Sequence, residues 1–442
     1  MPVFDPLISK MGFVSLGSRT VKKRSQSKEQ IVNSYTAHPR KGDKANSPFF
    51  EEWLPRLLEE RDRLGLTENI RRIDALMMTL EPGHSASYIR ELCLMTPYNY
   101  LVTLDTDQHL THILRIDMNY PDVLVREVKD PDLRGIFRSL NEVYPIGAKK
   151  PNARYMGEIF QVENLHEVVE IQKSREIRFF NQEQIRQMEL PGNMAIVKPS
   201  PYTHNIVGYW ERPDNDIRVY ALGNSRIDPD MQAAFEQAQE LRERVKISEL
   251  LLPIDHLATR IYSQNREVAI LEYLGLSSYY YWGSYDIPDQ NSSTNVTKSL
   301  HYDDVLHTPA KVFTAANHPY FCNHLLQIPS PTESFVRNFG PRLHHIAVAV
   351  RDGKTQGKTN IDYVVSSLAE CGQEFLLQVI GSEQEGLKQI FSRASTHTSL
   401  IIEYVQRFHG FEGFFTKENV ADLTAAAGTE ESLRSLESEA RQ

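Results

Sequence analysis

Apolar residues in the first part of the chain recur at intervals of three and four, which is the spacing of one helix face. Two such runs, Phe50–Leu58 and Ile70–Leu80, follow a polar N-terminal stretch. Pro82 and Gly83 interrupt the pattern, because proline lacks a backbone donor and glycine disfavours helix interiors. The pattern therefore predicts helices over most of residues 48–94.

Shorter apolar stretches separated by turn residues follow between residues 98 and 222, and they predict strands. The stretches are Tyr100–Leu104, Val123–Val128, Val168–Gln172 and Ile217–Leu222. The charged stretch after them, residues 228–249, is typical of a helix or a linker that leads into another domain. An N-terminal α/β region is therefore expected.

The order of predicted elements after Leu250 repeats. A strand at residues 254–262 precedes a helix at 265–274 and an aromatic, β-branched stretch that ends near Gln327. The second copy consists of a strand, a helix and three strands, at residues 343–350, 361–371, 374–379, 387–392 and 399–406. Two βαβββ modules side by side would curl into one open barrel around a cleft, so the predicted fold class is α+β.

Composition excludes several classes of protein. Hydrophobic residues make up 40% of the chain and charged residues 24%, which is typical of a folded protein. The net charge of −9 indicates no nucleic-acid partner. No apolar run approaches the roughly 20 residues that cross a membrane. Cys93, Cys322 and Cys371 are few and far apart, which favours a reducing compartment, so we expect a cytoplasmic protein.

Three predicted strands in the C-terminal half each hold one residue that can bind a metal: His256, His345 and Glu403. Side chains alternate along a strand, so each of the three points the same way as small or apolar residues two positions away. A carboxylate in such a setting must be paired, protonated or bound to a cation. Two imidazoles and one carboxylate are the facial set of non-haem Fe(II) oxygenases.

A second cluster of metal-capable residues lies in the N-terminal region. His109 and His112 stand close to Asp105 and Asp107 in the sequence. The segment is polar and turn-like, so a solvated loop is favoured over a metal site.

Three features near the C-terminal strands carry alternatives. Tyr279–Trp282 could form a substrate platform, but aromatic strand residues more often pack in a core or a subunit contact. Arg260 shares the alternating face of His256 and either meets an acidic substrate or is a strand-end charge. His344 is expected to point away from His345 and to form its hydrogen bond outside the barrel.

From Phe339 to about Leu423 the sequence resembles the catalytic half of 4-hydroxyphenylpyruvate dioxygenase. This family belongs to the vicinal oxygen chelate superfamily, together with hydroxymandelate synthase. The matching segments, in order, are 343–350, Gly372–Leu376, Leu387–Phe391 and Ile402–Arg407. Upstream, Ile254–His256 and the Ala316–Asn317 turn are also similar, and Gly410–Leu423 resembles the closing segment of the family with altered spacing. The first 245 residues show no such likeness.

The resemblance implies an enzyme with a defined set of metal ligands. His256, His345 and Glu403 would hold Fe(II), which the carboxylate and keto oxygens of a 2-oxo acid substrate chelate. Dioxygen would bind beside the substrate, and oxidative decarboxylation would lead to hydroxylation of the same molecule.

Further positions follow from the same resemblance. Gln389 and Phe391 would line the pocket. Phe414 or Phe415 would close over it, and Asn317 would contact the substrate. Gln389, Phe391 and Phe414 are the residues expected to act in catalysis.

The chain also departs from the family pattern. His344 stands where the family usually has glutamine, and Pro329–Pro331 replaces an Asn-Glu-Pro turn. Those positions help to read the phenol end of the family's substrate, so a different substrate is expected. Two alternatives keep the fold. One is an extradiol-type ring-cleaving dioxygenase or a metal-dependent isomerase, and the other is a non-catalytic binding or regulatory protein.

These inferences divide the chain into four parts. Residues 1–47 are expected to form a flexible basic arm, with a targeting segment as the alternative. Residues 48–245 form an N-terminal α/β domain of unassigned role, for which a diverged, metal-free copy of the modules is one interpretation. Residues 246–428 form the catalytic domain and 429–442 a charged tail. The homo-oligomeric state is left open.

Overall fold

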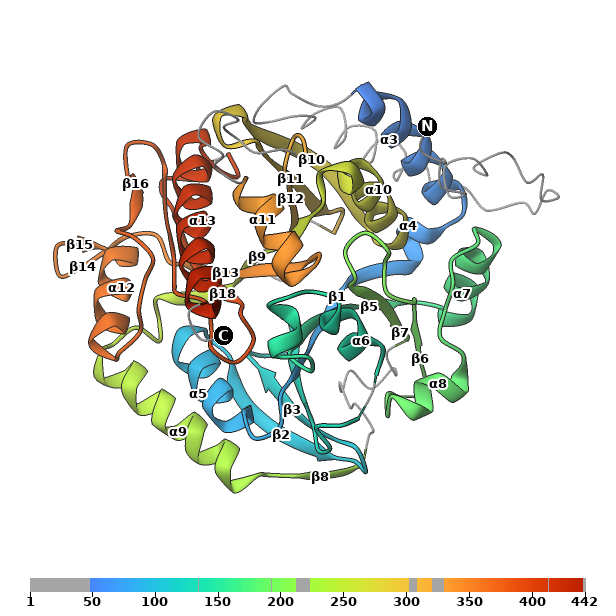
Figure 1. The fold of residues 1–442 in the computed structure, drawn as a ribbon, viewed down its shortest axis with the longest axis horizontal. Coiled ribbons are helices and arrows are strands. Elements are labelled where there is room, and N and C mark those ends of the chain that lie inside the picture. The colour runs from blue at the N-terminus through green and yellow to red at the C-terminus, as the bar shows by residue number, and fades with distance from the viewer. Residues whose placement is uncertain are drawn as a thin grey trace.

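The structure is a computed structural model, and it describes residues 48–133, 135–191, 193–211, 223–301, 308–319, 330–411 and 413–439. Two eight-stranded sheets, one from each half of the chain, form its centre (Figure 1). The predicted basic arm at 1–47 and the predicted strand Ile217–Leu222 lie outside the described residues. No described helix is long and apolar enough to cross a membrane.

The C-terminal sheet consists of the two predicted βαβββ modules. The first module comprises β9 (Leu251–Ile261), α10 (Arg266–Leu276), β10 (Tyr279–Ile287), β11 (Ser292–Ser299) and β12 (Ala310–Ala315). The second comprises β13 (Arg342–Val350), α12 (Asn360–Glu370), β16 (Ile380–Ser382), β17 (Leu387–Phe391) and β18 (Ile401–Arg407). The sheet order is β10-β11-β12-β9-β13-β18-β17-β16, which confirms the α+β class and the paired modules.

The first strands of the two modules, β9 and β13, pair antiparallel at the centre of the sheet. Each pairs on its other side, in parallel, with the last strand of its own module. Two helices complete this half: α11 (Pro331–Phe339) and α13 (Lys417–Glu439). Helix α13 packs against α11 and against strands β10 and β17 across the opening of the curled sheet (Figure 1).

The N-terminal sheet repeats this topology in an altered form. Its first module comprises β1 (Ile70–Leu80), α5 (Ser85–Met95), β2 (Asn99–Asp105), β3 (His109–Arg115) and β4 (Asp122–Val128). Its second comprises β5 (Arg154–Val162), α7 (Leu165–Ser174), α8 (Gln182–Gln187), β6 (Met194–Ile196) and β7 (Ile206–Glu211). As in the other half, β1 and β5 pair antiparallel at the centre, and each pairs in parallel with the last strand of its module. The N-terminal region is therefore a diverged copy of the C-terminal half.

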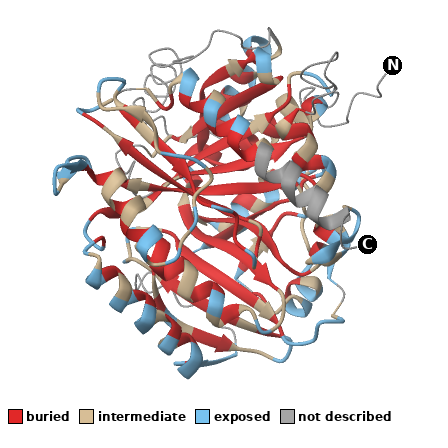
Figure 2. Ribbon diagram, turned by 60° about the vertical axis from the view of Figure 1, so that its left-hand side comes forward, coloured by how far each residue is buried: buried red, intermediate tan, exposed pale blue. Residues whose placement is uncertain are grey.

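The remaining elements lie around the two sheets. Strand β8 (Asn224–Arg226) extends the N-terminal sheet at β2, and α9 (Pro229–Arg244) leads from it to the C-terminal half. Smaller elements are α3 (Pro48–Arg63), α4 (Leu66–Asn69), α6 (Ile136–Glu142), the 3₁₀ turns Gly147–Lys149, Ser263–Asn265 and Pro288–Gln290, and the hairpin β14 (Lys354–Thr355) and β15 (Lys358–Thr359). Buried residues follow the strands of both sheets, and exposed residues lie on outer helix faces and loops (Figure 2).

Strand register identifies the N-terminal counterparts of the three candidate ligands. In the C-terminal sheet, Ala347 pairs with His256 on one side and with Glu403 on the other. Ile159 takes the place of Ala347 in the N-terminal sheet. Ala75 and Gly208 pair with Ile159, so they correspond to His256 and Glu403. Gly157 lies two positions before Ile159 and corresponds to His345.

None of these three counterparts has a side chain that can bind a metal. Gly157 has a φ of +155°, and a Cβ atom built there would lie 1.9 Å from the carbonyl oxygen of Ile206. Strands β5 and β7 thus approach too closely for a histidine at this position. The N-terminal copy is filled by the backbone of Ile206 at Gly157 and by the side chains of Ile159 and Ile196 at Gly208, where the C-terminal copy holds polar side chains.

Three secondary-structure predictions were wrong. Residues 70–80 form strand β1 instead of a helix, because β1 lies between β4 and β5 and is buried on both faces. A strand that is buried on both faces does not alternate between apolar and polar residues. Apolar residues then also occur three and four positions apart, as they do on one face of a helix. Residues 168–172 lie within helix α7, which starts with the side chain of Asn164 as its N-cap. Residues 374–379 form no strand, and β16 starts only at Ile380.

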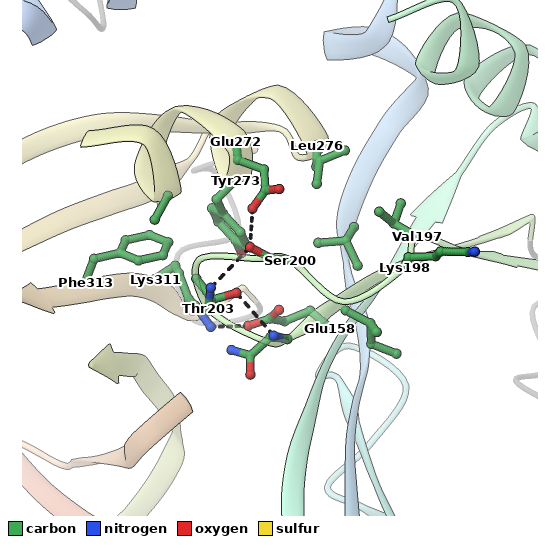
Figure 3. Close-up of a pocket in the computed structure, with 14 residues that line it drawn as sticks. Glu158, Val197, Lys198, Ser200, Thr203, Glu272, Tyr273, Leu276, Lys311 and Phe313 are labelled. Carbon is green, nitrogen blue, oxygen red and sulfur yellow. Dashed lines mark hydrogen bonds and ion pairs between the residues drawn. The ribbon is translucent and has the colours of Figure 1, made fainter. Parts of the chain in front are cut away.

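The two halves pack through a core that contains a buried ion pair. Lys311 of β12 and Glu158 of β5 are each 1% exposed, and the Lys311 Nζ lies 2.5 Å from the Glu158 Oε1 (Figure 3). The ammonium group also lies 5.5 Å from the ring centre of Tyr155 and 5.7 Å from that of Tyr273. The pair connects a strand of the C-terminal sheet directly to a strand of the N-terminal one.

Candidate metal centre

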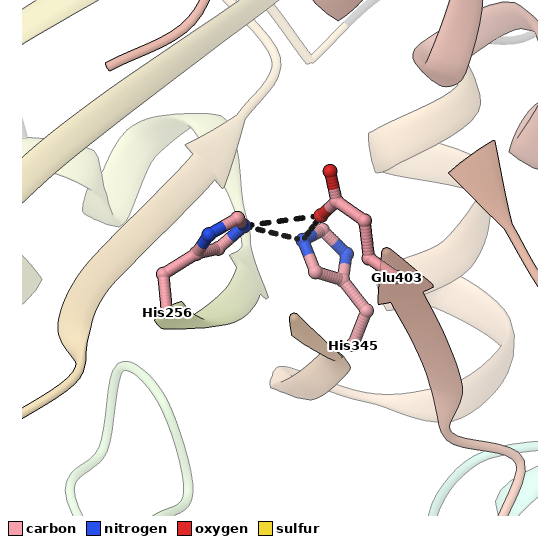
Figure 4. Close-up of side chains that lie close together, drawn as sticks. All are labelled: His256, His345 and Glu403. Carbon is pink, nitrogen blue, oxygen red and sulfur yellow. Dashed lines mark hydrogen bonds and ion pairs between the residues drawn. The ribbon is translucent and has the colours of Figure 1, made fainter. Parts of the chain in front are cut away.

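Strands β9, β13 and β18 bring His256, His345 and Glu403 together (Figure 4). The Glu403 Oε2 lies 3.1 Å from the Nε2 of His256 and 3.1 Å from the Nε2 of His345. The two Nε2 atoms lie 3.3 Å apart. Among the described residues, this is the one group of His, Cys, Asp and Glu side chains whose donor atoms converge in this way.

The separations of the donor atoms match those around a small divalent ion. Donor atoms about 2.1 Å from an ion lie about 3.0 Å apart in octahedral and about 3.4 Å apart in tetrahedral geometry. The observed separations of 3.1, 3.1 and 3.3 Å lie between these values. Three protein ligands leave further coordination positions for substrate, which fits a catalytic site better than a closed structural one.

A neighbouring carboxylate orients the first histidine. The Nδ1 of His256 lies 2.7 Å from the Oδ1 of Asp255, so its Nε2 is the atom left for a metal. Arg407 at the end of β18 holds that carboxylate with both of its terminal nitrogens. The same guanidinium donates to the carbonyl oxygen of Phe414 at 3.0 Å, which connects this network to the segment that leads into α13.

The second histidine is oriented by His344, whose predicted direction was wrong. The two Nδ1 atoms of His344 and His345 share a hydrogen bond of 2.8 Å, and His344 lines the same cavity as His345. The register between β9 and β13 shifts between Leu343 and His345, as in a β-bulge. A bulge breaks the alternation of faces, so two successive side chains can point to one side.

Gln389 fixes the orientation of the carboxylate. Its Nε2 donates to the Glu403 Oε1 at 2.5 Å, which leaves Oε2 for a metal. Asn419 of α13 donates in turn to the Oε1 of Gln389 at 3.2 Å. Asn419 was missed in the sequence analysis because a single asparagine in a helix carries no spacing signal. Each ligand thus has one atom held by a neighbour and one atom directed at the common centre.

The pKa values of the three ligands favour the binding of a cation. Burial alone would raise the pKa of Glu403, but the two imidazoles outweigh it and hold the pKa at about 2. Burial alone would lower the pKa of His256, but the carboxylates of Glu403 and Asp255 raise it to about 9. Burial lowers the pKa of His345. The cluster therefore has a buried anion whose countercharge is a proton, which a metal ion can displace.

A cavity of about 460 Å³ opens beside the three ligands. Gln389 and Phe391 line it, and the ring of Phe391 lies 4.8 Å from that of His345. Phe415 lines it from the side of α13, with its ring 5.2 Å from that of His256. The Phe414 ring lies 5.4 Å from His256 but is not among the lining residues.

Other candidate residues lie outside this cavity. The amide of Asn317 donates to the Oδ1 of Asp286 at 2.6 Å and accepts from Arg266 at 3.2 Å. Asn317 is not among the residues that line the cavity. The aromatic stretch Tyr279–Trp282 is buried in β10 and packs in the core, as favoured from the sequence.

The N-terminal histidines do not form a metal site, and the predicted solvated loop was wrong. His109 and His112 lie on β3 and are 7% and 0% exposed. The Nδ1 of His109 lies 2.8 Å from Glu189, and the Nδ1 of His112 lies 2.9 Å from the hydroxyl of Thr103. The two imidazoles thus have separate partners, and the Nε2 of His112 is buried without a hydrogen bond to any described residue.

We expect Gln389→Met to weaken metal binding about 10- to 100-fold, the usual effect of losing a hydrogen bond to a metal ligand. Methionine keeps the length of the side chain but cannot donate to Glu403. Calorimetric titration of the metal-free protein with Fe(II) under anaerobic conditions measures the change. Gln378→Met, at an exposed position, is the matched control. Equal affinity in both variants would contradict the role of Gln389.

Among the comparisons with known proteins, those with solved structures support the fold. No protein-family model matches the sequence, and neither does any curated protein sequence. A variant of 4-hydroxymandelate synthase from Streptomyces coelicolor superposes with a TM-score of 0.56 and 15% identity, covering 81% of this chain and 98% of that one. A fusion protein of a xylose isomerase-like TIM barrel and 4-hydroxyphenylpyruvate dioxygenase gives a TM-score of 0.52 and 13% identity, covering 85% of this chain and 57% of that one.

The likeness of fold therefore extends beyond the C-terminal half, to which the sequence resemblance is confined. Both sheets of this chain take part, because the matches cover more than four fifths of it. The chain has the vicinal oxygen chelate fold.

Proposed function

We propose that the chain is an Fe(II)-dependent dioxygenase that oxidatively decarboxylates a 2-oxo acid and hydroxylates the same molecule. The observation that carries the proposal is the buried set of His256, His345 and Glu403, with donor atoms 3.1 to 3.3 Å apart. A structural metal site would be closed by a fourth protein ligand, whereas this one faces a cavity.

The residues around the cavity have distinct tasks in this proposal. Bound Fe(II) would supply the coordination positions for the substrate and for O₂, together with the redox chemistry. Gln389 keeps Glu403 from turning away, and Phe391 and Phe415 provide apolar walls that confine the substrate and exclude water. Asp255 and His344 hold the two imidazoles in place, so the site changes little during the reaction.

The overall reaction balances without a further reductant. The substrate carboxyl group leaves as CO₂, and the keto carbon becomes the new carboxylate by taking one atom of O₂. The second oxygen atom is inserted into a C–H bond of the same molecule as a hydroxyl group. Cleavage of the C–C bond supplies two electrons and oxidation of the C–H bond supplies two more, which together reduce O₂.

The test is to load metal-free protein with Fe(II) and to supply a panel of aryl and alkyl 2-oxo acids. Equal amounts of O₂ consumed and CO₂ released, with ¹⁸O from ¹⁸O₂ in the product, would support the proposal. O₂ uptake without CO₂ release from a catechol would assign ring cleavage instead. Stoichiometric metal binding without any turnover or 2-oxo acid binding would favour a binding protein and overturn the proposal.

A further inference from the structure

Arg407 connects a metal ligand to the segment that precedes α13. It is the last residue of β18, four residues after Glu403, and its side chain is 23% exposed. Both of its terminal nitrogens hold the carboxylate of Asp255, which orients His256. One of these nitrogens also donates to the carbonyl oxygen of Phe414 at 3.0 Å. A single guanidinium group therefore contacts both the metal centre and Phe414.

The shape of this guanidinium fixes its two partners relative to each other. Its carbon atom lies 5.0 Å from the ring centre of Phe414, so it holds this residue by the ring as well as by the carbonyl group. The nitrogen that donates to Phe414 also lies 3.2 Å from the Asp255 Oδ1. The N–H bonds of a guanidinium have fixed directions in one plane. A displacement of Phe414 therefore disturbs the hydrogen bonds to Asp255.

Phe414 packs against His256 and against strand β10. Its ring centre lies 5.4 Å from that of His256, 5.9 Å from that of Trp282 and 4.6 Å from that of Phe415. Phe414 is 5% exposed. The backbone amide of Phe415 donates to the hydroxyl of Tyr285 at 3.0 Å, which holds the same segment on β10. Phe414 and Phe415 thus dock together, on the side of the metal centre where Arg407 ends.

We propose that Arg407 is a positioning residue that makes metal binding and the docking of Phe414 depend on each other. While Phe414 is docked, the guanidinium keeps Asp255 on the Nδ1 of His256, so the Nε2 stays directed at the metal. This inference rests on the metal centre of the proposed function, but it requires neither O₂ nor a 2-oxo acid. Coupling of two events is reciprocal. Docking must therefore strengthen metal binding by the same factor by which bound metal strengthens docking.

Arg407 has two effects on metal affinity, and they have opposite signs. Its positive charge repels a cation at the ligands, so removal of the charge alone would tighten metal binding. Its hydrogen bonds keep Asp255 and His256 in place, so their removal would weaken metal binding. The side chain is partly exposed, and water screens its charge, so we expect positioning to outweigh repulsion. Arg407→Met should lose about 10-fold in affinity, the lower end for outer-shell partners, because Arg407 acts through Asp255.

The test is a double-mutant cycle on metal affinity, measured by anaerobic calorimetric titration of the metal-free protein with Fe(II). Arg407→Met and Phe414→Ala should each weaken binding about 10-fold. The double variant should also lose only about 10-fold, because both substitutions break the same connection. A loss of about 100-fold in the double variant would mean that the two residues act independently, and it would overturn the coupling. Unchanged or tighter binding by either single variant would overturn it as well.

Hydrogen exchange supplies a measurement that an arginine with a merely structural role would not change. The amide of Phe415 is bonded to Tyr285 only while the segment is docked, so its exchange rate reports docking. Bound Zn(II), which adds no redox chemistry, should slow exchange in the peptide that contains Phe415 by about 10-fold in the unchanged protein. It should have no such effect in Arg407→Met. Equal slowing in both proteins would contradict the proposal.

Two controls separate positioning from folding. Arg351→Met removes a guanidinium whose side chain is 56% exposed, and it should bind metal like the unchanged protein. Thermal unfolding shows whether the variants keep their fold. Should Arg407→Met fail to fold, the same cycle with Arg407→Lys decides instead, because lysine keeps the charge but lacks the planar group that reaches both partners.

The failure of this inference differs from the failure of the proposed function. If the unchanged protein binds no Fe(II), the metal centre is wrong and both fail together. If it binds Fe(II) and the cycle is additive, or if Arg407→Met binds Fe(II) as tightly as the unchanged protein, only the coupling is wrong and the proposed function stands.

Discussion

Replacing His345 with alanine should weaken metal binding by more than about 100-fold, because it removes a direct ligand, and loss of an outer-shell partner alone costs 10- to 100-fold. The remaining donors, His256 and Glu403, would form a hydrogen-bonded pair with no third group to complete a site. Metal content after gel filtration and O₂ uptake with the preferred 2-oxo acid are the measurements. Both should fall to background.

The matched control for this variant is His409→Ala, which removes an imidazole whose side chain is 74% exposed. It should bind metal and consume O₂ like the unchanged protein. Circular dichroism shows whether the His345 variant has kept its fold, and His344→Ala/His345→Ala shows whether the neighbouring imidazole can substitute as a ligand. Undiminished turnover in the folded double variant would rule out the metal centre described above.

The C-terminal half could be predicted from the sequence because its strands are short and its polar residues stand out. His256, His345 and Glu403 each interrupt an apolar strand, and a buried polar group at such a place needs a partner. Three such residues in the order of a known family then identify one site. The order of strand, helix and three strands occurs twice, and this repeat predicted the fold class.

The features that could not be predicted depend on contacts between distant segments. Strand β1 has helical spacing, and only its place between β4 and β5 explains why both faces are apolar. His344 points into the cavity because of a register shift between β9 and β13, which leaves no mark in the residues themselves. Asn419 reaches Gln389 only because α13 packs on β17. In each case, packing in three dimensions overrides the local pattern.

Replacing Lys311 with methionine should lower the free energy of unfolding by about 3–5 kcal/mol, the usual cost of removing one partner of a buried ion pair. Lys311 and Glu158 are each 1% exposed, so the substitution leaves the Glu158 carboxylate without its counter-ion inside the protein. Methionine fills much of the same space, so a cavity contributes little to the expected loss. Urea denaturation followed by circular dichroism and fluorescence measures the change.

The double variant Lys311→Met/Glu158→Gln distinguishes the loss of charge balance from the loss of packing. Replacing both ions with neutral groups of similar volume is often neutral for stability, so the double variant should regain most of what Lys311→Met loses. Lys173→Met, which removes the partner of Glu170 in a pair more than half exposed, should leave the midpoint unchanged. A double variant as unstable as the single one would mean that the amine contributes through its contacts with Tyr155 and Tyr273 instead.

Lys311 lies close to the strands of the metal centre, so the stability that its ion pair contributes should affect metal binding. Lys311 lies on β12 next to Val312, which lines the cavity, and β12 pairs with β9, the strand that carries His256. Glu158 lies on β5, the strand of the N-terminal sheet that corresponds to β13. The ion pair therefore connects a strand of the N-terminal sheet to β12, one of the strands that build the cavity. Lys311→Met should accordingly bind metal normally at low temperature and lose it at a lower temperature than the unchanged protein does.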